Sequence, residues 1–167
     1  PSQASLPGFE TFRYHAQRGR TPRPGPDGPV VTIGNQDLTD PAQLRAFVDW
    51  GRFTYPAERT ALVLWNRGGG ADGVIADVTS AGGRSMSLAG LRSALQGLPP
   101  LDLVDFDMAL GGGYETLESV KDAARVVTFS QGEVSPQGNP YGLFLAGLSA
   151  QATMDGRTFA ALVVDRF

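Results

Sequence analysis

Two short apolar segments, residues 62–70 and 103–110, each run from a predicted strand into a loop with polar side chains. The loops carry a carboxylate and a guanidinium, which bind ions of opposite charge, and no group that attacks a carbonyl near neutral pH. Cysteine is absent from the 167 residues, which excludes thiol catalysis, disulfides and thiolate metal sites. The loop residues that could form a site are Asn66, Arg67, Gly68, Asp107, Met108 and Ala109.

The elements that must hold these loops follow from apolar periodicity and from helix-start residues. Asp40 followed by Pro41 predicts an amphipathic helix over residues 41–54, because Asp caps a helix and Pro fits its first turn. Ser87 caps a second predicted helix with leucines at helical spacing. The other predictions are strands over 12–17, 30–33, 60–65, 101–106 and 125–130, helices over 114–124, 140–150 and 156–166, and a loop over 18–29.

The central pattern of strand, helix, strand, helix and strand predicts right-handed parallel crossovers. The fold class is therefore α/β: a three-layer α/β/α sandwich with a mainly parallel central sheet. We expect the apolar runs 60–65 and 101–106 to be strands buried on both faces. In such a sheet the functional crevice lies beyond the carboxyl ends of the strands, which adds Ser130 and Glu133 to the rim.

Both loops resemble the active-site loops of the clostripain-like cysteine peptidases. In that family a Trp-Asp/Asn-His-Gly pattern supplies the catalytic histidine, and residues 65–68 read Trp-Asn-Arg-Gly. A Phe-Asp-Ala-Cys-Leu pattern supplies the nucleophile, and residues 106–110 read Phe-Asp-Met-Ala-Leu. The resemblance implies the caspase-like fold, shared with caspases and gingipains. Further segments resemble the family in the same order: 34–41, 44–50, 55–57, 130–133 and 138–141.

The resembling segments cover most of residues 30–167, which we expect to form a single caspase-like domain. Residues 1–29 are expected to add a short strand and a loop rich in Pro, Gly and Arg. The family normally opens with a further strand that nothing here matches, so the chain is either a fragment or has lost or replaced that strand. The open sheet edge could be covered by a partner segment, by a second copy, or by residues 12–17 or 18–29.

The resemblance implies a cysteine peptidase whose catalytic pair is missing. Arg67 stands where the family has its histidine, and a guanidinium with a pKa above ~12 cannot exchange protons near neutral pH. Ala109 stands where the family has its cysteine and offers no nucleophile. We therefore interpret the chain as a pseudopeptidase, not an enzyme, that binds a protein or peptide or serves as a structural domain. The alternative is a peptidase specific for Arg or Lys that depends on displaced residues, a missing segment or an engineered Cys-to-Ala change.

Asp107 corresponds to the family's aspartate in the primary specificity pocket, where it favours an Arg or Lys side chain. The interpretation that we favour from the sequence is that Arg67 enters this space and pairs with Asp107, because a guanidinium fork suits a carboxylate. The alternative interpretation of Asp107 is a retained specificity pocket that binds basic peptides without cutting them. The remaining residues of that vestigial pocket would be Asn66, Gly68, Met108, Ser130 and Glu133.

Metal binding and a serine or histidine mechanism have little support in the sequence. Asp105 and Asp107 share a face of an extended segment and, with Asp102, invite a metal site, but solvated carboxylates are the default. His15, the only histidine, lies in a predicted peripheral strand, and Ser130 has no evident base. We expect no bound metal and no cofactor.

Composition limits the partners. The net charge of −3 gives no support for nucleic-acid binding, which usually shows as a basic excess. No apolar run approaches the ~18–20 residues of a membrane span, and residues 1–23 lack the apolar stretch of a signal peptide. The family resemblance leans toward a secreted or cell-envelope location. The expected partner is a protein or a basic peptide.

Overall fold

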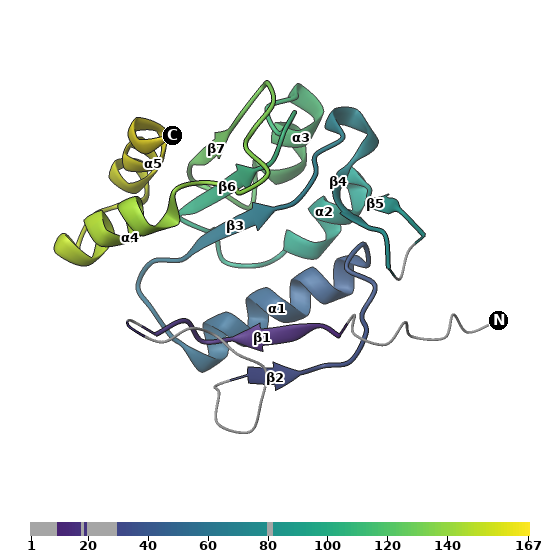
Figure 1. The fold of residues 1–167 in the computed structure, drawn as a ribbon, viewed down its shortest axis with the longest axis horizontal. Helices are drawn as coiled ribbons and strands as arrows, with labels where there is room; N and C mark the ends of the chain where they lie inside the picture. The colour runs from purple at the N-terminus through teal and green to yellow at the C-terminus, as the bar shows by residue number, and fades with distance from the viewer. Residues whose placement is uncertain (1–9, 18, 20–29, 80–81) are drawn as a thin grey trace.

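The computed structural model describes residues 10–17, 19, 30–79 and 82–167 (Figure 1). Its centre is a parallel sheet in the order β3-β6-β7, and the carboxyl ends of all three strands lie at one edge. Two antiparallel strand pairs, β1 with β2 and β4 with β5, lie outside this sheet. The strands are β1 Phe12–Tyr14, β2 Val30–Thr32, β3 Ala61–Trp65, β4 Val74–Asp77, β5 Arg84–Met86, β6 Leu103–Asp107 and β7 Val127–Phe129.

Helices cover both faces of the central sheet, so the fold has the expected three layers. One hydrophobic cluster joins α1 and α2 to β3 and β6, and a second joins α4 and α5 to the other face of β6. Figure 1 shows α4 and α5 together on the side of the sheet away from β4 and β5. The helices are α1 Pro41–Thr54, α2 Leu88–Leu95, α3 Tyr114–Val120, α4 Tyr141–Ala150 and α5 Gly156–Arg166, with a short 3-10 helix η1 at Gly70–Asp72.

The first helix forms where the sequence predicts it. Asp40 Oδ1 accepts a hydrogen bond from the Ala42 N–H at 2.9 Å, and Pro41 occupies the first turn. A cap of this kind contributes about 1 kcal/mol to helix stability. Leu44 and Val48 are buried against β3 and α2, so α1 closes one face of the sheet.

The central strands differ in burial, and one expectation is wrong. All five residues of β6 are buried, as predicted for the middle strand of a parallel sheet. Strand β3, at the edge of the sheet, is buried on one face only. Leu62 and Leu64 pack in the cluster with α1 and α2, whereas the cluster with α4 and α5 contains no residue of β3 and Trp65 is 57% exposed.

The N-terminal strand does not cover that edge. β1 pairs with β2, with Phe12 opposite Thr32, and forms no ladder with β3. Apart from Gly19, the predicted loop 18–29 lies outside the described residues. Within the described part of the chain, therefore, no strand pairs with the free edge of β3.

Helix α3 ends at Val120, whereas the sequence pattern extends it to residue 124. The backbone beyond Val120 is used for sheet pairing instead. Leu101 N–H donates to Ala123 O at 2.8 Å, and Arg125 N–H donates to Leu101 O at 2.9 Å. None of the helices among the described residues has the length and apolar character needed to cross a bilayer.

Candidate functional site

The two loops at the carboxyl ends of β3 and β6 are in direct contact. Trp65 and Asp107 are opposite each other in the parallel ladder, so both loops leave the sheet at the same level. Gly68 then packs onto the neighbouring loop so closely that a Cβ there would lie 1.9 Å from Ala109 O. Only glycine allows this approach. The structure thus brings the two predicted loops together at Gly68 and Ala109.

Side chains and backbone geometry fix both loops. Asn66 Oδ1 accepts hydrogen bonds from the N–H groups of Arg67, at 2.7 Å, and Ala76, at 2.9 Å. Two non-glycine residues beside the loops have positive φ angles, Ile75 at 53° and Leu110 at 56°. Such conformations cost about 1–3 kcal/mol each and persist only where the surroundings enforce them.

The segment after β7 forms the third side of the site. Leu110 N–H donates to Gly132 O at 3.3 Å, and Gly112 N–H donates to Ser130 O at 3.1 Å. The Ser130 hydroxyl interacts with the backbone of Gly132, accepting from its N–H at 3.1 Å. Glu133 is exposed and projects from this segment.

A buried network of hydrogen bonds surrounds the two carboxylates at the end of β6. Asp105 is 3% exposed, and it accepts from Thr128 Oγ1 at 2.7 Å and from Asn139 Nδ2 at 2.9 Å. Asp107 is 2% exposed, and its Oδ2 accepts from Asn139 N–H at 2.8 Å and from the Tyr141 hydroxyl. The turn that precedes α4 therefore holds both carboxylates.

The turn can reach Asp107 because of the residue that begins it. Gly138 has a φ of +75°, and a Cβ there would lie 2.6 Å from Asp107 Oδ2 and 2.8 Å from Trp65 Nε1. A side chain would collide with both groups and is disfavoured by the backbone conformation. Gly138 is therefore part of the structure that encloses Asp107.

Burial raises the pKa values of two groups in this network, Asp105 and Tyr141. Removal from water is the main cause that raises the pKa of Asp105, and the neighbouring Asp107 carboxylate raises it further, against the hydrogen bonds from Thr128 and Asn139. Burial also raises the pKa of Tyr141, and its hydrogen bond to Asp107 adds to that effect. Tyr141 thus remains a neutral donor to the carboxylate over the physiological pH range.

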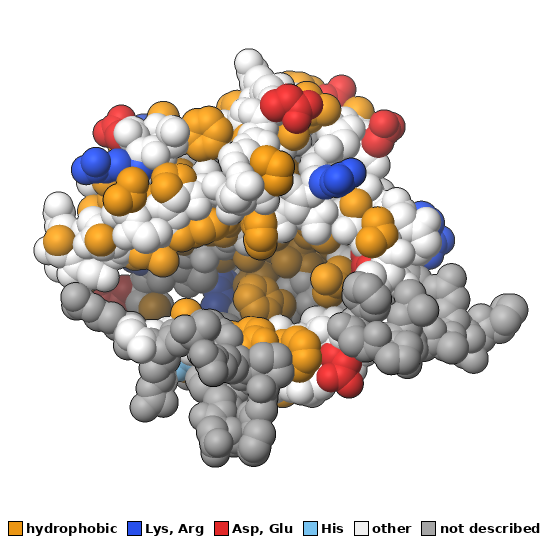
Figure 2. Space-filling model, viewed as in Figure 1, with side chains coloured by type: hydrophobic (Ala, Val, Ile, Leu, Met, Phe, Trp, Pro, Cys, Tyr) orange, Lys and Arg blue, Asp and Glu red, His pale blue; other side chains and the backbone are white. Residues whose placement is uncertain are grey.

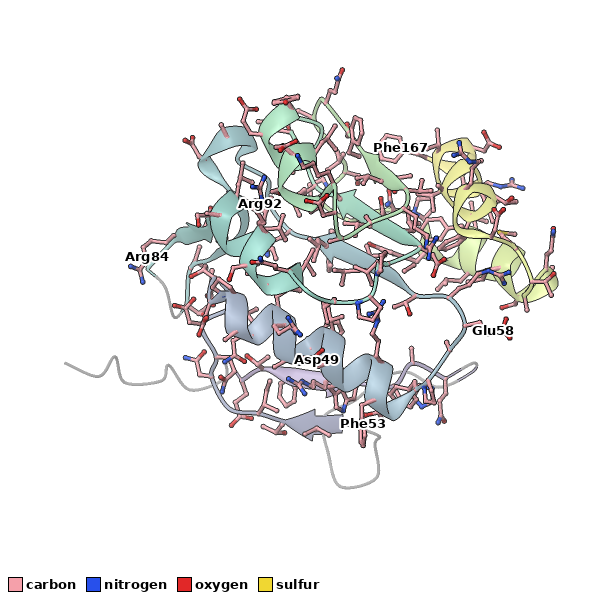
Figure 3. The ribbon with its side chains drawn as sticks, turned by 180° about the vertical axis from the view of Figure 1, so that it is seen from behind. Asp49, Phe53, Glu58, Arg84, Arg92 and Phe167 are labelled. Carbon is pink, nitrogen blue, oxygen red and sulfur yellow. The ribbon has the colours of Figure 1, made fainter. Side chains whose placement is uncertain are left out.

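Asp107 also lines a small cavity of about 110 Å³ between the strand ends and the C-terminal end of α5. Its Oδ1 atom is buried and has no hydrogen-bond partner among the described residues. Asp105, Thr128, Ser130 and Asn139 line the same cavity, whose apolar wall includes Phe167, labelled in Figure 3. A buried carboxylate oxygen without a donor favours a ligand that supplies a positively charged or N–H group.

The expected ion pair between Arg67 and Asp107 does not form. Arg67 is exposed, and the ion pairs among the described residues do not include it. The Oδ2 atom of Asp107 is occupied by the N–H of Asn139 and by the hydroxyl of Tyr141. The turn that precedes α4 therefore holds the Asp107 carboxylate in place of Arg67.

The other predicted site residues are divided between the site and its surroundings. Met108 is 0% exposed and belongs to the hydrophobic cluster under α1 and α2, so it supports its loop from inside. His15 stacks on Tyr55, 4.3 Å between ring centroids, just after α1 and toward the amino end of β3. Among the described residues, no group of three or more acidic or histidine side chains could hold a metal ion.

Sequence reasoning missed the residues that hold the carboxylates: Thr128, Asn139 and Tyr141. The last two lie 32 and 34 positions after Asp107, so no local pattern connects them. The available signal was the Gly-Asn-Pro-Tyr turn at residues 138–141, which starts a helix immediately after the predicted rim segment. Polar residues in a turn next to the predicted strand ends could have identified partners for the carboxylates.

Comparison with solved structures supports the fold. A secreted cysteine protease from Bacteroides thetaiotaomicron, solved with an irreversible peptide inhibitor, superposes with a TM-score of 0.69 at 22% identity over 87% of this chain and 42% of that chain. An inactive zymogen protease from Parabacteroides distasonis superposes with a TM-score of 0.63 at 22% identity, over 87% of this chain and 41% of that chain. The secreted cysteine protease iotapain from B. thetaiotaomicron superposes with a TM-score of 0.62 at 15% identity, over 81% of this chain and 43% of that chain.

The chain therefore spans less than half the length of these structural relatives. A search of curated proteins by sequence gives no match. The model of the clostripain family matches residues 29–167, which is most of the chain and includes both loops and the turn at Gly138. The chain belongs to the clostripain family.

Proposed function

We propose that this domain does not hydrolyse peptides and instead binds a basic side chain of a protein or peptide at Asp107. The observation that carries the proposal is the contact between the two loops at Gly68 and Ala109. At that contact the positions of the family's catalytic pair carry Arg67 and Ala109. The buried Asp107 lies directly below, with one oxygen free of hydrogen bonds to the described residues.

Loss of hydrolysis follows from the chemistry of these side chains. Acyl transfer by this family's route needs a thiolate and a group that exchanges its proton, and alanine and arginine supply neither. The Ser130 hydroxyl has only the backbone of Gly132 as a hydrogen-bond partner among the described residues, so no base is hydrogen-bonded to it there. His15 packs against Tyr55, toward the opposite end of β3.

Binding of a cation is supported by the surroundings of Asp107. The cavity of about 110 Å³ has room for the end of one long side chain. Arg67 leaves the space open, since it is exposed to solvent. An ammonium or guanidinium would donate to Asp107 Oδ1 in a site of low dielectric, where a charge-assisted hydrogen bond is strong.

The test is a titration with fluorescein-labelled tripeptides, Ala-Ala-Arg, Ala-Ala-Lys and Ala-Ala-Ala, followed by fluorescence anisotropy and by an assay for cleavage. We expect the two basic peptides to bind at least about tenfold more tightly than the alanine peptide, without turnover. Asp107→Asn should remove this preference, while Asp49→Asn, an exposed carboxylate on α1, should preserve it.

Two results would contradict the proposal. Equal binding of all three peptides, or no binding, would leave only a structural role for the domain. Cleavage by the unchanged chain would establish the alternative of a peptidase with displaced chemistry. The variant Arg67→His with Ala109→Cys gives a further check: cleavage after basic residues by this variant alone would mean that the surrounding loops still have a productive geometry.

A further inference from the structure

The cavity at Asp107 contains a second buried carboxylate, that of Asp105. Both side chains line the cavity, and Asp107 is 2% and Asp105 3% exposed. Asn139 joins the two, because its N–H donates to Asp107 Oδ2 and its Nδ2 donates to Asp105 Oδ2. The two carboxylates therefore form one buried unit of the site, and the charge of each acts on the protonation of the other.

No cation among the described residues balances this pair. Neither aspartate takes part in the ion pairs of the described chain. The other lining residues, from β6, β7, the segment after β7, the turn at Asn139 and α5, have uncharged side chains. Tyr141 of α4 donates its hydroxyl to Asp107 and is neutral below its raised pKa. Two buried carboxylates without a cation are costly, so the pair favours uptake of a proton or of a ligand's positive charge.

Charged residues of the surrounding elements lie in solvent. Arg67 in the loop after β3, Glu133 after β7, and Asp165 and Arg166 on α5 are all exposed, and none of them lines the cavity. On the face seen in Figure 2, the Lys and Arg side chains lie apart from one another and form no basic patch. The positive charge that balances the pair therefore comes from solvent, as a proton, or from a ligand.

Asp105 can take the proton without losing a hydrogen bond. Thr128 Oγ1 donates to Asp105 Oδ1 at 2.7 Å, and a hydroxyl can turn from donor to acceptor when the carboxyl group is protonated. Burial raises the pKa of Asp105, and the charge of Asp107 raises it further. Asp107 Oδ1, in contrast, has no partner among the described residues. Proton and ligand thus have separate places, the proton on Asp105 and the ligand's cation at Asp107 Oδ1.

We infer that the site exchanges a proton for its ligand: a basic side chain that binds at Asp107 favours release of the proton from Asp105. The inference rests on the proposed binding of a basic side chain and adds its regulation by pH. The ligand's charge offsets that of Asp107, which removes the repulsion that favours a neutral Asp105. By linkage, loss of the proton from Asp105 strengthens ligand binding to the same extent. Affinity therefore rises with pH until Asp105 is fully ionised.

The test is isothermal titration calorimetry with acetyl-Ala-Ala-Lys-amide, a peptide whose single titratable group has a pKa of about 10.4. We expect its dissociation constant to be at least about fivefold higher at pH 4.5 than at pH 8. Titrations in two buffers with different heats of ionisation should show release of a fraction of one proton on binding, and this fraction should decline toward high pH. The ¹³C chemical shift of the Asp105 carboxyl group, followed by NMR, should report a lower pKa in the bound than in the free protein.

Two variants assign the effect to Asp105. Asp105→Asn has the shape and charge of the protonated carboxyl group, so it should bind the lysine peptide more weakly at pH 8 and with much less change over this pH range. Thr128→Val removes a hydrogen bond that lowers the pKa of Asp105, so it should move the midpoint of the profile to higher pH. Asp49→Asn, on the exposed face of α1, is the control and should keep the original profile. Because proton release is measured on the unchanged chain, the test does not depend on the folding of either variant.

Two results would overturn the inference and leave the proposed binding site intact. One is a preference for the lysine peptide over acetyl-Ala-Ala-Ala-amide with an affinity that does not change with pH and no proton release. The other is the same pH profile in Asp105→Asn as in the unchanged chain, which would assign the proton to another group. Absence of any preference for the lysine peptide at pH 8 would instead overturn the cation site itself, and the inference with it.

Discussion

The hydrogen bond from Tyr141 to Asp107 is the contact whose removal tests the site most directly. Tyr141→Phe deletes the hydroxyl and retains the ring, which packs edge-on against Phe144 at 5.3 Å between centroids. Asp107 is only 2% exposed, so water cannot readily replace the lost donor. A hydrogen bond to a charged group contributes about 1.5–3 kcal/mol. Because Tyr141 is itself partly exposed, we expect the lower part of this range, about 1.5–2 kcal/mol.

The assay is urea unfolding at pH 7. We expect Tyr141→Phe to lower the urea concentration at the unfolding midpoint and to leave the m-value unchanged. Tyr114→Phe is the matched control, because Tyr114 is 77% exposed and its substitution should change stability by less than about 0.5 kcal/mol. Arg67→Ala should behave like this control, since Arg67 lies in solvent. A small effect of Tyr141→Phe combined with a loss above about 1 kcal/mol for Arg67→Ala would refute the reasoning. That combination of results would instead indicate an ion pair between Arg67 and Asp107.

The pH dependence of the same variant has a defined sign. The pKa of Tyr141 is raised in the folded state, so its stabilising contribution is complete below the ordinary tyrosine value of 10.0. The contribution is lost as the pH rises from that value toward the higher pKa of the folded state. The difference in unfolding free energy between Tyr141→Phe and the unchanged chain should therefore be constant up to about pH 9 and shrink above pH 10.

Two further predictions follow from the same region. Gly68→Ala should destabilise the domain by about 2–4 kcal/mol in urea unfolding. The new Cβ would lie 1.9 Å from Ala109 O, so the backbone must move to make room for it. Gly142→Ala is the control, because the space around its Cβ is open. Asp105 has a raised pKa, so the stability of the unchanged chain relative to Asp105→Asn should be greatest below pH 3.8 and fall as the pH rises through the folded-state value. A flat difference across that range would mean that Asp105 titrates normally.

Local signals in the sequence were enough for the elements with strong boundaries. Helix α1 has the predicted bounds, because an aspartate cap and a proline in the first turn leave little choice for its start. The juxtaposition of the loops at Gly68 and Ala109 also followed from sequence, since parallel strands place their carboxyl ends at one edge.

The sequence could not show features that depend on distant partners. The β4–β5 pair has short strands and a register shift between Val74 and Ala76, so periodicity gives no signal. Helix α3 stops at Val120 because the next residues pair with Leu101, which overrides their helical preference. The most consequential error was the position of Arg67. Charge complementarity in the sequence favoured a pair with Asp107, but Asn139 and Tyr141 hold that carboxylate from a distant part of the chain and Arg67 is exposed.

Trp65 lies next to the turn that holds Asp107, because a Cβ at Gly138 would lie 2.8 Å from Trp65 Nε1 and 2.6 Å from Asp107 Oδ2. A substitution of Trp65 would therefore disturb the turn together with the carboxylate, and it would not identify which of them binds a peptide. Asp107→Asn changes the carboxylate at the end of β6 and leaves Trp65, opposite it at the end of β3, in place. Comparing this variant with the unchanged chain on the basic and alanine peptides separates recognition of a basic side chain from a purely structural role of the turn.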